Sequence, residues 1–136
     1  MADGSIFYNK DYKNPNAELV KNVAINTAKS LHLSWIDNQK LILIGKLVEF
    51  YQSKNIRIIF LKIPYHPDYF KTVNINQGNI LNKYEQFFDE FANKKNILIY
   101  GSLNPNNVGI ASNNFYDLYH CSGESINKNI LTNITK

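Results

Sequence analysis

The sequence predicts an α/β protein with a parallel sheet, and three features of the 136-residue chain predict it. Residues 56–63 (IRIIFLKI) form an almost continuous apolar run, which a Pro-Tyr-His-Pro cluster at residues 64–67 ends. Residues 96–100 (NILIY) form a second apolar run, which Gly101 closes. Segments with helical spacing precede and separate the two runs. This order is typical of parallel sheets with right-handed crossovers, and we expect one domain over residues 1–136.

Four segments carry helical signals. Residues 16–34 repeat apolar side chains at helical spacing, and residues 37–54 do so behind Asp37, which we expect to be the N-cap. Residues 77–94 form a third helix, rich in Phe, and the chain ends in a modest helix. The apolar positions are Leu19, Val20, Val23, Ala24, Ala28 and Leu31 in residues 16–34, and Leu41, Ile44, Leu47, Val48 and Tyr51 in residues 37–54. They are Ile80, Leu81, Tyr84, Phe87, Phe88 and Phe91 in residues 77–94, and Ile126, Ile130 and Leu131 in the last helix.

The strands predict a sheet that lacks a neighbour. The run 56–63 does not alternate, so we expect both of its faces to be buried inside a sheet. The chain offers only one further strand candidate, the loosely alternating segment 5–14 (SIFYNKDYKN). Because stable sheets usually need more than two strands, we expect the sheet to be incomplete at its N-terminal side. The N-terminal arm or a partner chain would complete it, or the chain is the later part of a longer domain, which is the interpretation we favour.

Composition and charge exclude several classes of protein. The Lys and Arg residues give a net charge of +4 but are scattered, so we expect no nucleic-acid partner. The single cysteine excludes an internal disulfide, the three histidines lack metal-site spacing, and no Gly-rich phosphate loop is present, so we expect no metal or other cofactor. No apolar run is long enough to cross a bilayer. The first ten residues lack the apolar region of a signal peptide, which leaves the compartment open, with the cell envelope a candidate for a longer protein.

The strongest chemical signal is the segment 115–125 (FYDLYHCSGES), in which Asp117 precedes His120 by three residues. In open α/β sheets, reactive groups gather beyond the carboxyl ends of the strands, where we expect this pair to lie. On a turn leading into a helix, Asp117 can accept the Nδ1 proton of His120, which leaves Nε2 as a general base. The alternative is structural: Asp117 caps a turn, and His120 lies on the surface.

Three segments resemble the SGNH (GDSL-like) hydrolase family, particularly its divergent envelope-associated branch. They are the helix leading into residues 56–63 with the loop 64–70, the Phe-rich helix that ends in residues 97–100, and the block 115–120 (FYDLYH), which looks like the family's terminal D-x-x-H motif. The resemblance covers roughly residues 36–133. It implies a flavodoxin-like three-layer α/β/α fold and Ser-His-Asp hydrolysis or transfer of O-acyl esters, often on carbohydrates. By this resemblance, His120 is the base and Asp117 its orienting acid.

The sequence departs from the family at the nucleophile. Such hydrolases carry a Gly-Asp-Ser block after the first strand and oxyanion donors in later blocks, and nothing in this sequence matches either. Asp3-Gly4-Ser5 has the same residues in another order, and Ser102 follows Gly101 at the end of a late strand. We therefore expect the chain to be the C-terminal portion of an SGNH-like domain, without its nucleophilic Ser and nearly inactive alone.

Several other residues have both structural and functional interpretations. Tyr65 and His66, at the end of the first apolar run, are expected to bind the substrate, an O-acylated small molecule or carbohydrate; a structural role is the alternative for His66. Cys121 follows the histidine of the pair, but adjacent side chains usually point apart, which argues against a Cys–His dyad. We expect His32 at the edge of the core and Trp35 as a packing anchor between the first two helices.

A second class of function is open to the chain. A non-catalytic interaction domain would dock a partner or a second copy of the chain through the open sheet edge, because an exposed apolar edge invites pairing. This interpretation requires no chemistry at Asp117 and His120. A stable dimer in solution would favour it.

Overall fold

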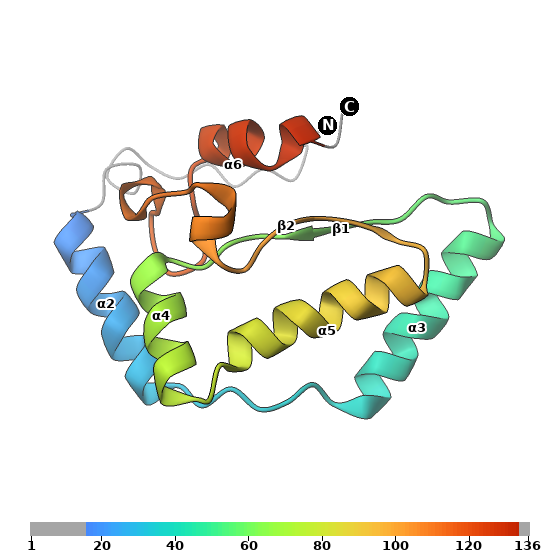
Figure 1. Cartoon of the computed structure of the whole chain (residues 1–136), viewed down its shortest axis with the longest axis horizontal. Coiled ribbons are helices and arrows are strands. Elements are labelled where there is room, and N and C mark those ends of the chain that lie inside the picture. The colour runs from blue at the N-terminus through green and yellow to red at the C-terminus, as the bar shows by residue number, and fades with distance from the viewer. Residues whose placement is uncertain (1–15, 134–136) are drawn as a thin grey trace, which may run out of the picture.

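The structure, a computed structural model, describes residues 16–133 (Figure 1). Two strands, β1 (Ile59–Lys62) and β2 (Leu98–Gly101), form a parallel sheet in which Ile59 lies opposite Leu98 and Lys62 opposite Gly101. The helices are α2 (Ala17–Ser30), α3 (Asn38–Ser53), α4 (Pro67–Asn76), α5 (Ile80–Lys94) and α6 (Gly123–Asn129), with 3₁₀ turns η1 (Pro105–Val108), η2 (Ser112–Asn114) and η3 (Leu131–Asn133). The expected α/β character is confirmed, and the arm at residues 5–14 lies outside the described residues.

Side-chain caps fix where α2 and α3 begin. The Asn16 side chain accepts hydrogen bonds from the backbone N–H groups of Glu18 and Leu19, at 3.0 and 3.2 Å. Asp37 accepts in the same way from Gln39 N at 2.7 Å and from Lys40 N at 3.4 Å, so its predicted role as an N-cap is confirmed.

The helix at residues 67–76 was not predicted, because the two prolines were interpreted only as the end of a strand. Pro67 occupies the first turn of α4, where its missing N–H costs nothing, and His66 is the N-cap. The following helix begins at Ile80 rather than at residue 77, because Gly78 and Asn79 adopt φ angles of +60° and +61°.

Both strands are shorter and more exposed than predicted. Each has four residues, and the β1 side chains alternate between exposed and half-buried. Ile59 is 38% exposed and Leu61 is 41% exposed, so the prediction that both faces of this strand are buried was wrong. The described residues therefore leave some apolar side chains of β1 uncovered.

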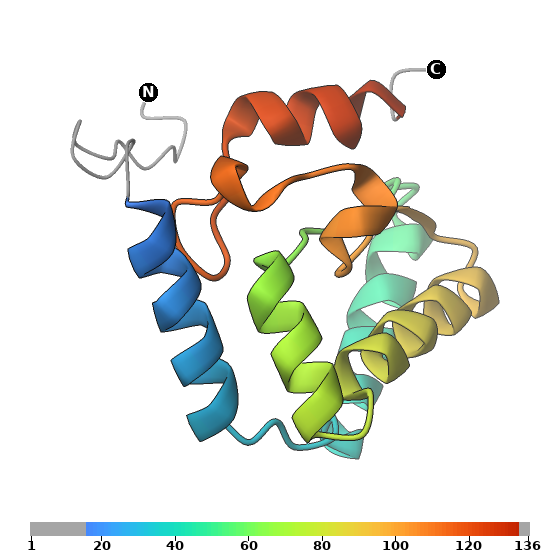
Figure 2. The ribbon, with the colours of Figure 1, turned by 60° about the vertical axis from the view of Figure 1, so that its left-hand side comes forward.

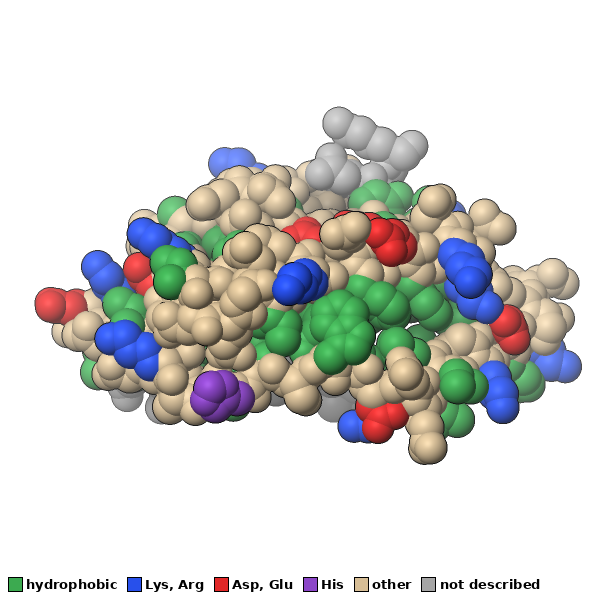
Figure 3. Space-filling model, turned by 60° about the horizontal axis from the view of Figure 1, so that its bottom comes forward, with side chains coloured by type: hydrophobic (Ala, Val, Ile, Leu, Met, Phe, Trp, Pro, Cys, Tyr) green, Lys and Arg blue, Asp and Glu red, His purple; other side chains and the backbone are tan. Residues whose placement is uncertain are grey.

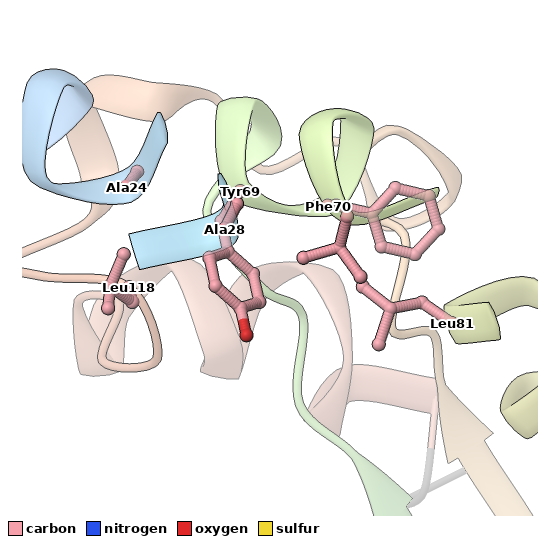
Figure 4. Close-up of a cluster of buried hydrophobic side chains, with 7 residues drawn as sticks. Ala24, Ala28, Tyr69, Phe70, Leu81 and Leu118 are labelled. Carbon is pink, nitrogen blue, oxygen red and sulfur yellow. The ribbon is translucent and has the colours of Figure 1, made fainter. Parts of the chain in front are cut away.

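The main core joins α2, α4 and the start of α5 (Figure 4). Ala24 and Ala28 are fully buried on α2, and their small side chains allow α4 to lie close alongside (Figure 2). The buried members of this main core are Ala24, Ala28, Tyr69, Phe70, Val73, Leu81 and Leu118. Two smaller clusters flank the sheet, one built on Val48, Ala92 and Ile97, the other on Ile110, Phe115, Cys121 and Ile130.

Two sequence predictions about this region were wrong. Trp35 is 50% exposed and its ring contacts Tyr84 and Phe87 of α5, at centroid distances of 5.3 and 6.0 Å, rather than filling the space between α2 and α3. His32 is exposed in the connection after α2, because that helix ends at Ser30.

None of the helices within residues 16–133 is long and apolar enough to cross a membrane.

Two glycines provide a matched test of this packing. Gly101 ends β2 at a φ of +80°, and a Cβ there would lie 2.2 Å from the carbonyl oxygen of Lys62, whereas a Cβ on Gly45 in α3 would meet nothing within 4 Å. We expect Gly101→Ala to lower the free energy of unfolding by about 2 kcal/mol or more. Gly45→Ala should raise it by about 0.5–1 kcal/mol, because alanine favours the helix. Urea unfolding of both variants measures this, and a neutral Gly101→Ala would contradict the strand pairing.

Candidate functional site

The candidate site is a turn at residues 115–121 that lies at the carboxyl end of β1. His66, which follows β1, donates its backbone N–H to the carbonyl of Leu118 in this turn at 2.9 Å. Its neighbour Tyr65 donates to the carbonyl of Leu103, in the segment after β2, at 3.1 Å. Backbone hydrogen bonds therefore hold the turn where parallel α/β sheets carry their reactive groups.

The turn is closed by its own backbone. Phe115 and Cys121 form an antiparallel bridge, and Tyr116 N donates to the carbonyl of His120 at 2.8 Å. Phe115 and Cys121 are buried, as is Leu118 in between, so the base and middle of the turn are fixed in the core. The remaining residues are left on its outer side.

Asp117 organises the tip of the turn with both carboxylate oxygens. Its Oδ1 accepts the backbone N–H groups of Tyr119 and His120, both at 2.8 Å. Its Oδ2 lies 2.7 Å from Nδ1 of the His120 ring. The side chain of His120 is 51% exposed and that of Asp117 is 28% exposed. Asp117 therefore caps the turn and contacts the imidazole at once, so the predicted contact and the predicted cap occur together.

Cys121 takes no part in this pair. Its side chain is buried with Ile110, Phe115 and Ile130, while the neighbouring His120 is exposed. Burial raises the pKa of the Cys121 thiol, which disfavours the reactive thiolate. This agrees with the expectation that adjacent side chains point apart.

Three tyrosine rings form a cluster that includes Tyr119, the residue before His120. Tyr65, Tyr69 and Tyr119 contact one another with centroid distances of 5.4, 5.6 and 5.7 Å. Burial, followed by a hydrogen bond to Tyr119, raises the pKa of Tyr69, and burial raises that of Tyr65. The sequence predicts that Tyr119 shields the pair, and in the structure Tyr119 is 42% exposed.

The structure places His66 in a structural role, the alternative that the sequence left open beside a contact with a substrate. The side chain is 1% exposed, packs edge-on against Phe115, and accepts the backbone N–H of Asp68 on Nδ1 at 3.2 Å. Burial lowers the pKa of His66, the Asp68 carboxylate partly offsets this, and Lys21 adds to it. The ring therefore caps α4 from a buried position.

Ser102, the strand-end serine considered as a nucleophile, is also used structurally. It is 4% exposed, and its Oγ accepts hydrogen bonds from Asn104 N at 3.0 Å and from Asn107 Nδ2 at 3.1 Å. These contacts fold the loop after β2. A serine so enclosed is poorly suited to attack an ester.

A polar pocket of about 310 Å³ lies between the starts of α2 and α4, lined by Ala17, Glu18, Lys21, Asn22, Asp68 and Ser112. The sequence did not indicate it, because α4 was missed and Asp68 could not be assigned near α2. Within residues 16–133, no three His, Cys, Asp or Glu side chains are grouped to hold a metal ion.

No family model matches the sequence, and no curated protein or solved structure matches the chain. The SGNH resemblance therefore stays a prediction. The geometry of the Asp117–His120 turn stands independently of it.

The buried cap predicts a pH-dependent stability. Because the folded pKa of His66 lies below its ordinary value of 6.5, the unfolded chain binds the proton more readily. The contribution to the free energy of unfolding is complete above pH 6.5 and is lost as the pH falls through the folded pKa. His66→Asn keeps a capping side chain that does not titrate, so the variant should lose less stability on acidification than the native chain.

Urea unfolding at several pH values between about 4.5 and 7.5 measures this difference. His32→Asn, at an exposed histidine, is the control and should retain the native pH profile. Identical profiles for His66→Asn and the native chain would show that the buried ring does not couple protonation to folding.

Proposed function

We propose that Asp117 and His120 are the acid and base of an SGNH-like ester hydrolase or acyltransferase that acts on O-acyl esters. The observation that carries this proposal is the 2.7 Å contact between Asp117 Oδ2 and His120 Nδ1 on a turn at the carboxyl end of a parallel strand. A carboxylate against Nδ1, an exposed imidazole and a strand-end location together are what general-base catalysis requires.

The chemistry follows from the orientation of the ring. Asp117 accepts the Nδ1 proton, so the neutral imidazole carries its lone pair on Nε2. His120 then removes a proton from a serine hydroxyl as the oxygen attacks the acyl carbon, and Asp117 stabilises the imidazolium. The same histidine returns the proton to the leaving alkoxide, and a water or an acceptor hydroxyl takes the acyl group in the second half of the reaction.

The serine is proposed to come from a segment other than the loop of Ser102, whose Oγ is enclosed. The exposed apolar side chains of β1 support a sheet with further strands, and thus the flavodoxin-like three-layer arrangement in which the described residues form the C-terminal portion. In that arrangement the loop after a further parallel strand would lie at the same end of the sheet as the turn, where it could carry the nucleophile.

The proposed substrate is an O-acylated small molecule or carbohydrate. Tyr119 is partly exposed next to the pair, and Tyr65 supports it with an edge-on contact at 5.6 Å. Aromatic rings of this kind offer a flat apolar surface against which a sugar ring can stack. Tyr65 is kept as a substrate-binding residue in this proposal, and His66 is not.

The tautomer of His120 is the most direct test. We expect the neutral ring to be protonated on Nδ1, detected by long-range ¹H–¹⁵N correlation of the histidine rings. Asp117→Asn retains an oxygen that can cap the turn but removes the carboxylate, so the population protonated on Nε2 should rise at least several-fold. A native ring already protonated mainly on Nε2 would contradict the proposed base.

Hydrolysis of p-nitrophenyl acetate tests the activity of the chain itself. Without a positioned serine, we expect slow turnover that still exceeds that of free imidazole, because Asp117 stabilises the imidazolium, and that falls at least about tenfold in His120→Ala. His32→Ala, at a second exposed histidine, should leave the rate unchanged. Robust turnover that survives His120→Ala would rule out this assignment.

A further inference from the structure

Helix α3 has two apolar faces, and only one of them is covered within the described residues. Gly45 and Val48 are buried, and Val48 packs against Ala92 and Ile97 beside the start of β2. The other face is exposed. It consists of Leu43 (63% exposed), Ile44 (37%), Leu47 (53%), Phe50 (56%) and Tyr51 (39%). Spacings of three and four residues put these side chains on one stripe of the helix.

A groove of about 530 Å³ continues this stripe along β1. The five consecutive residues Ile59–Ile63 line it, together with Ile44 of α3, Phe88 of α5, and Ile99 and Leu103 in and after β2. The groove therefore follows β1 over its whole length and reaches β2. Ile59 and Leu61 are exposed in it. Hydrophobic side chains also form a continuous area on the face shown in Figure 3, rather than lying singly.

The outer edge of β1 is suited to accept another strand. Its only partner strand within residues 16–133 is β2 on the other side. An edge strand presents N–H and C=O groups that can pair with a further chain, and proteins usually block such an edge with charge or proline. The one charged side chain of β1, Lys62, is engaged with Glu85 and Asp89 of α5.

We infer that a second copy of this chain covers the edge of β1 and the exposed stripe of α3. The two β1 strands pair antiparallel across a two-fold axis, which makes a four-stranded sheet in the order β2, β1, β1 of the partner and β2 of the partner. The exposed stripe of α3 from each copy packs over the joined β1 strands. This inference does not rest on the proposed esterase activity, but it requires that any further strand of the domain lies beyond β2 rather than beside β1.

The charges around β1 are complementary for this orientation. Lys54 and Arg57 precede the strand, and the Lys54 ammonium lies 5.9 Å from the centre of the Phe50 ring in the exposed stripe. At the other end, Glu85 and Asp89 share the single ammonium of Lys62, at 3.2 and 2.6 Å, which leaves a net negative charge. Antiparallel pairing brings the start of one strand opposite the end of the other, so basic and acidic ends meet twice.

The apolar area is adequate for a stable dimer. Seven large side chains between 37% and 63% exposed form the stripe and the strand edge. With about 200 Å² for each large apolar side chain, they offer on the order of 600 Å² per copy. A stable interface buries about 800 Å² per partner, of which somewhat more than half is apolar, so the polar rim supplies the remainder.

Sedimentation of the full chain between about 1 and 100 µM tests the inference. We expect a dimer of twice 15.7 kDa with a dissociation constant in the micromolar range or below. Leu47→Glu places a charge in the exposed stripe and should raise the dissociation constant at least about tenfold. Ile75→Glu, at a 71% exposed position on α4, is the matched control and should leave it unchanged.

A charge exchange tests the orientation. Arg57→Glu and Asp89→Lys should each weaken the dimer several-fold, and the double variant should restore much of the native affinity because the pair is re-formed across the axis. Circular dichroism of each variant verifies the fold. A monomer throughout this concentration range overturns the inference, as does a dimer that Leu47→Glu and Ile75→Glu affect equally. Failure of the double variant to recover excludes the antiparallel arrangement.

Discussion

The site depends on two backbone hydrogen bonds at the end of β1. Tyr65 N–H binds the carbonyl of Leu103, and His66 N–H binds the carbonyl of Leu118, so the segment after β2 and the candidate turn are both tied to the residues that leave β1. Helix α4 begins at Pro67, directly after its N-cap His66. The helix and the proline ring restrict the backbone of these two residues. Because these partners are backbone groups, the position of the turn relies on the path of the chain rather than on flexible side chains.

The Asp117 carboxylate makes two kinds of contact, and an informative substitution must change only one of them. Its Oδ1 holds the backbone of the turn and its Oδ2 holds the imidazole, so removing the whole side chain would disturb the position and the chemistry of His120 together. An amide keeps an acceptor for the backbone and loses the negative charge. The same geometry serves a capped turn and a catalytic pair. What distinguishes them is a reacting hydroxyl near Nε2, and this is why the nucleophile matters more than further detail of the pair.

The sequence was informative where local rules decide the structure. Helical spacing and the Asp37 cap predicted α3 well, and the spacing of Asp117 and His120 offered their contact as one of two alternatives, which the structure contains. Prediction failed where a residue has two local meanings or depends on distant neighbours. Proline ends a strand and also begins a helix, so α4 was missed, and with it the buried role of His66. An apolar run shows that a strand is suited to burial on both faces, but the coverage of β1 depends on which elements lie against it.

The site and the exposed surface share one strand. The candidate turn lies at the carboxyl end of β1, and the residues of β1 line the apolar groove. A short strand with one paired side opens locally at a low free energy, whereas pairing on both sides raises that free energy toward the value for the whole fold. Burial of Ile59 and Leu61 by any added strand would therefore stabilise the segment that anchors Leu118. Completion of the sheet and order in the Asp117–His120 turn are coupled through the same backbone.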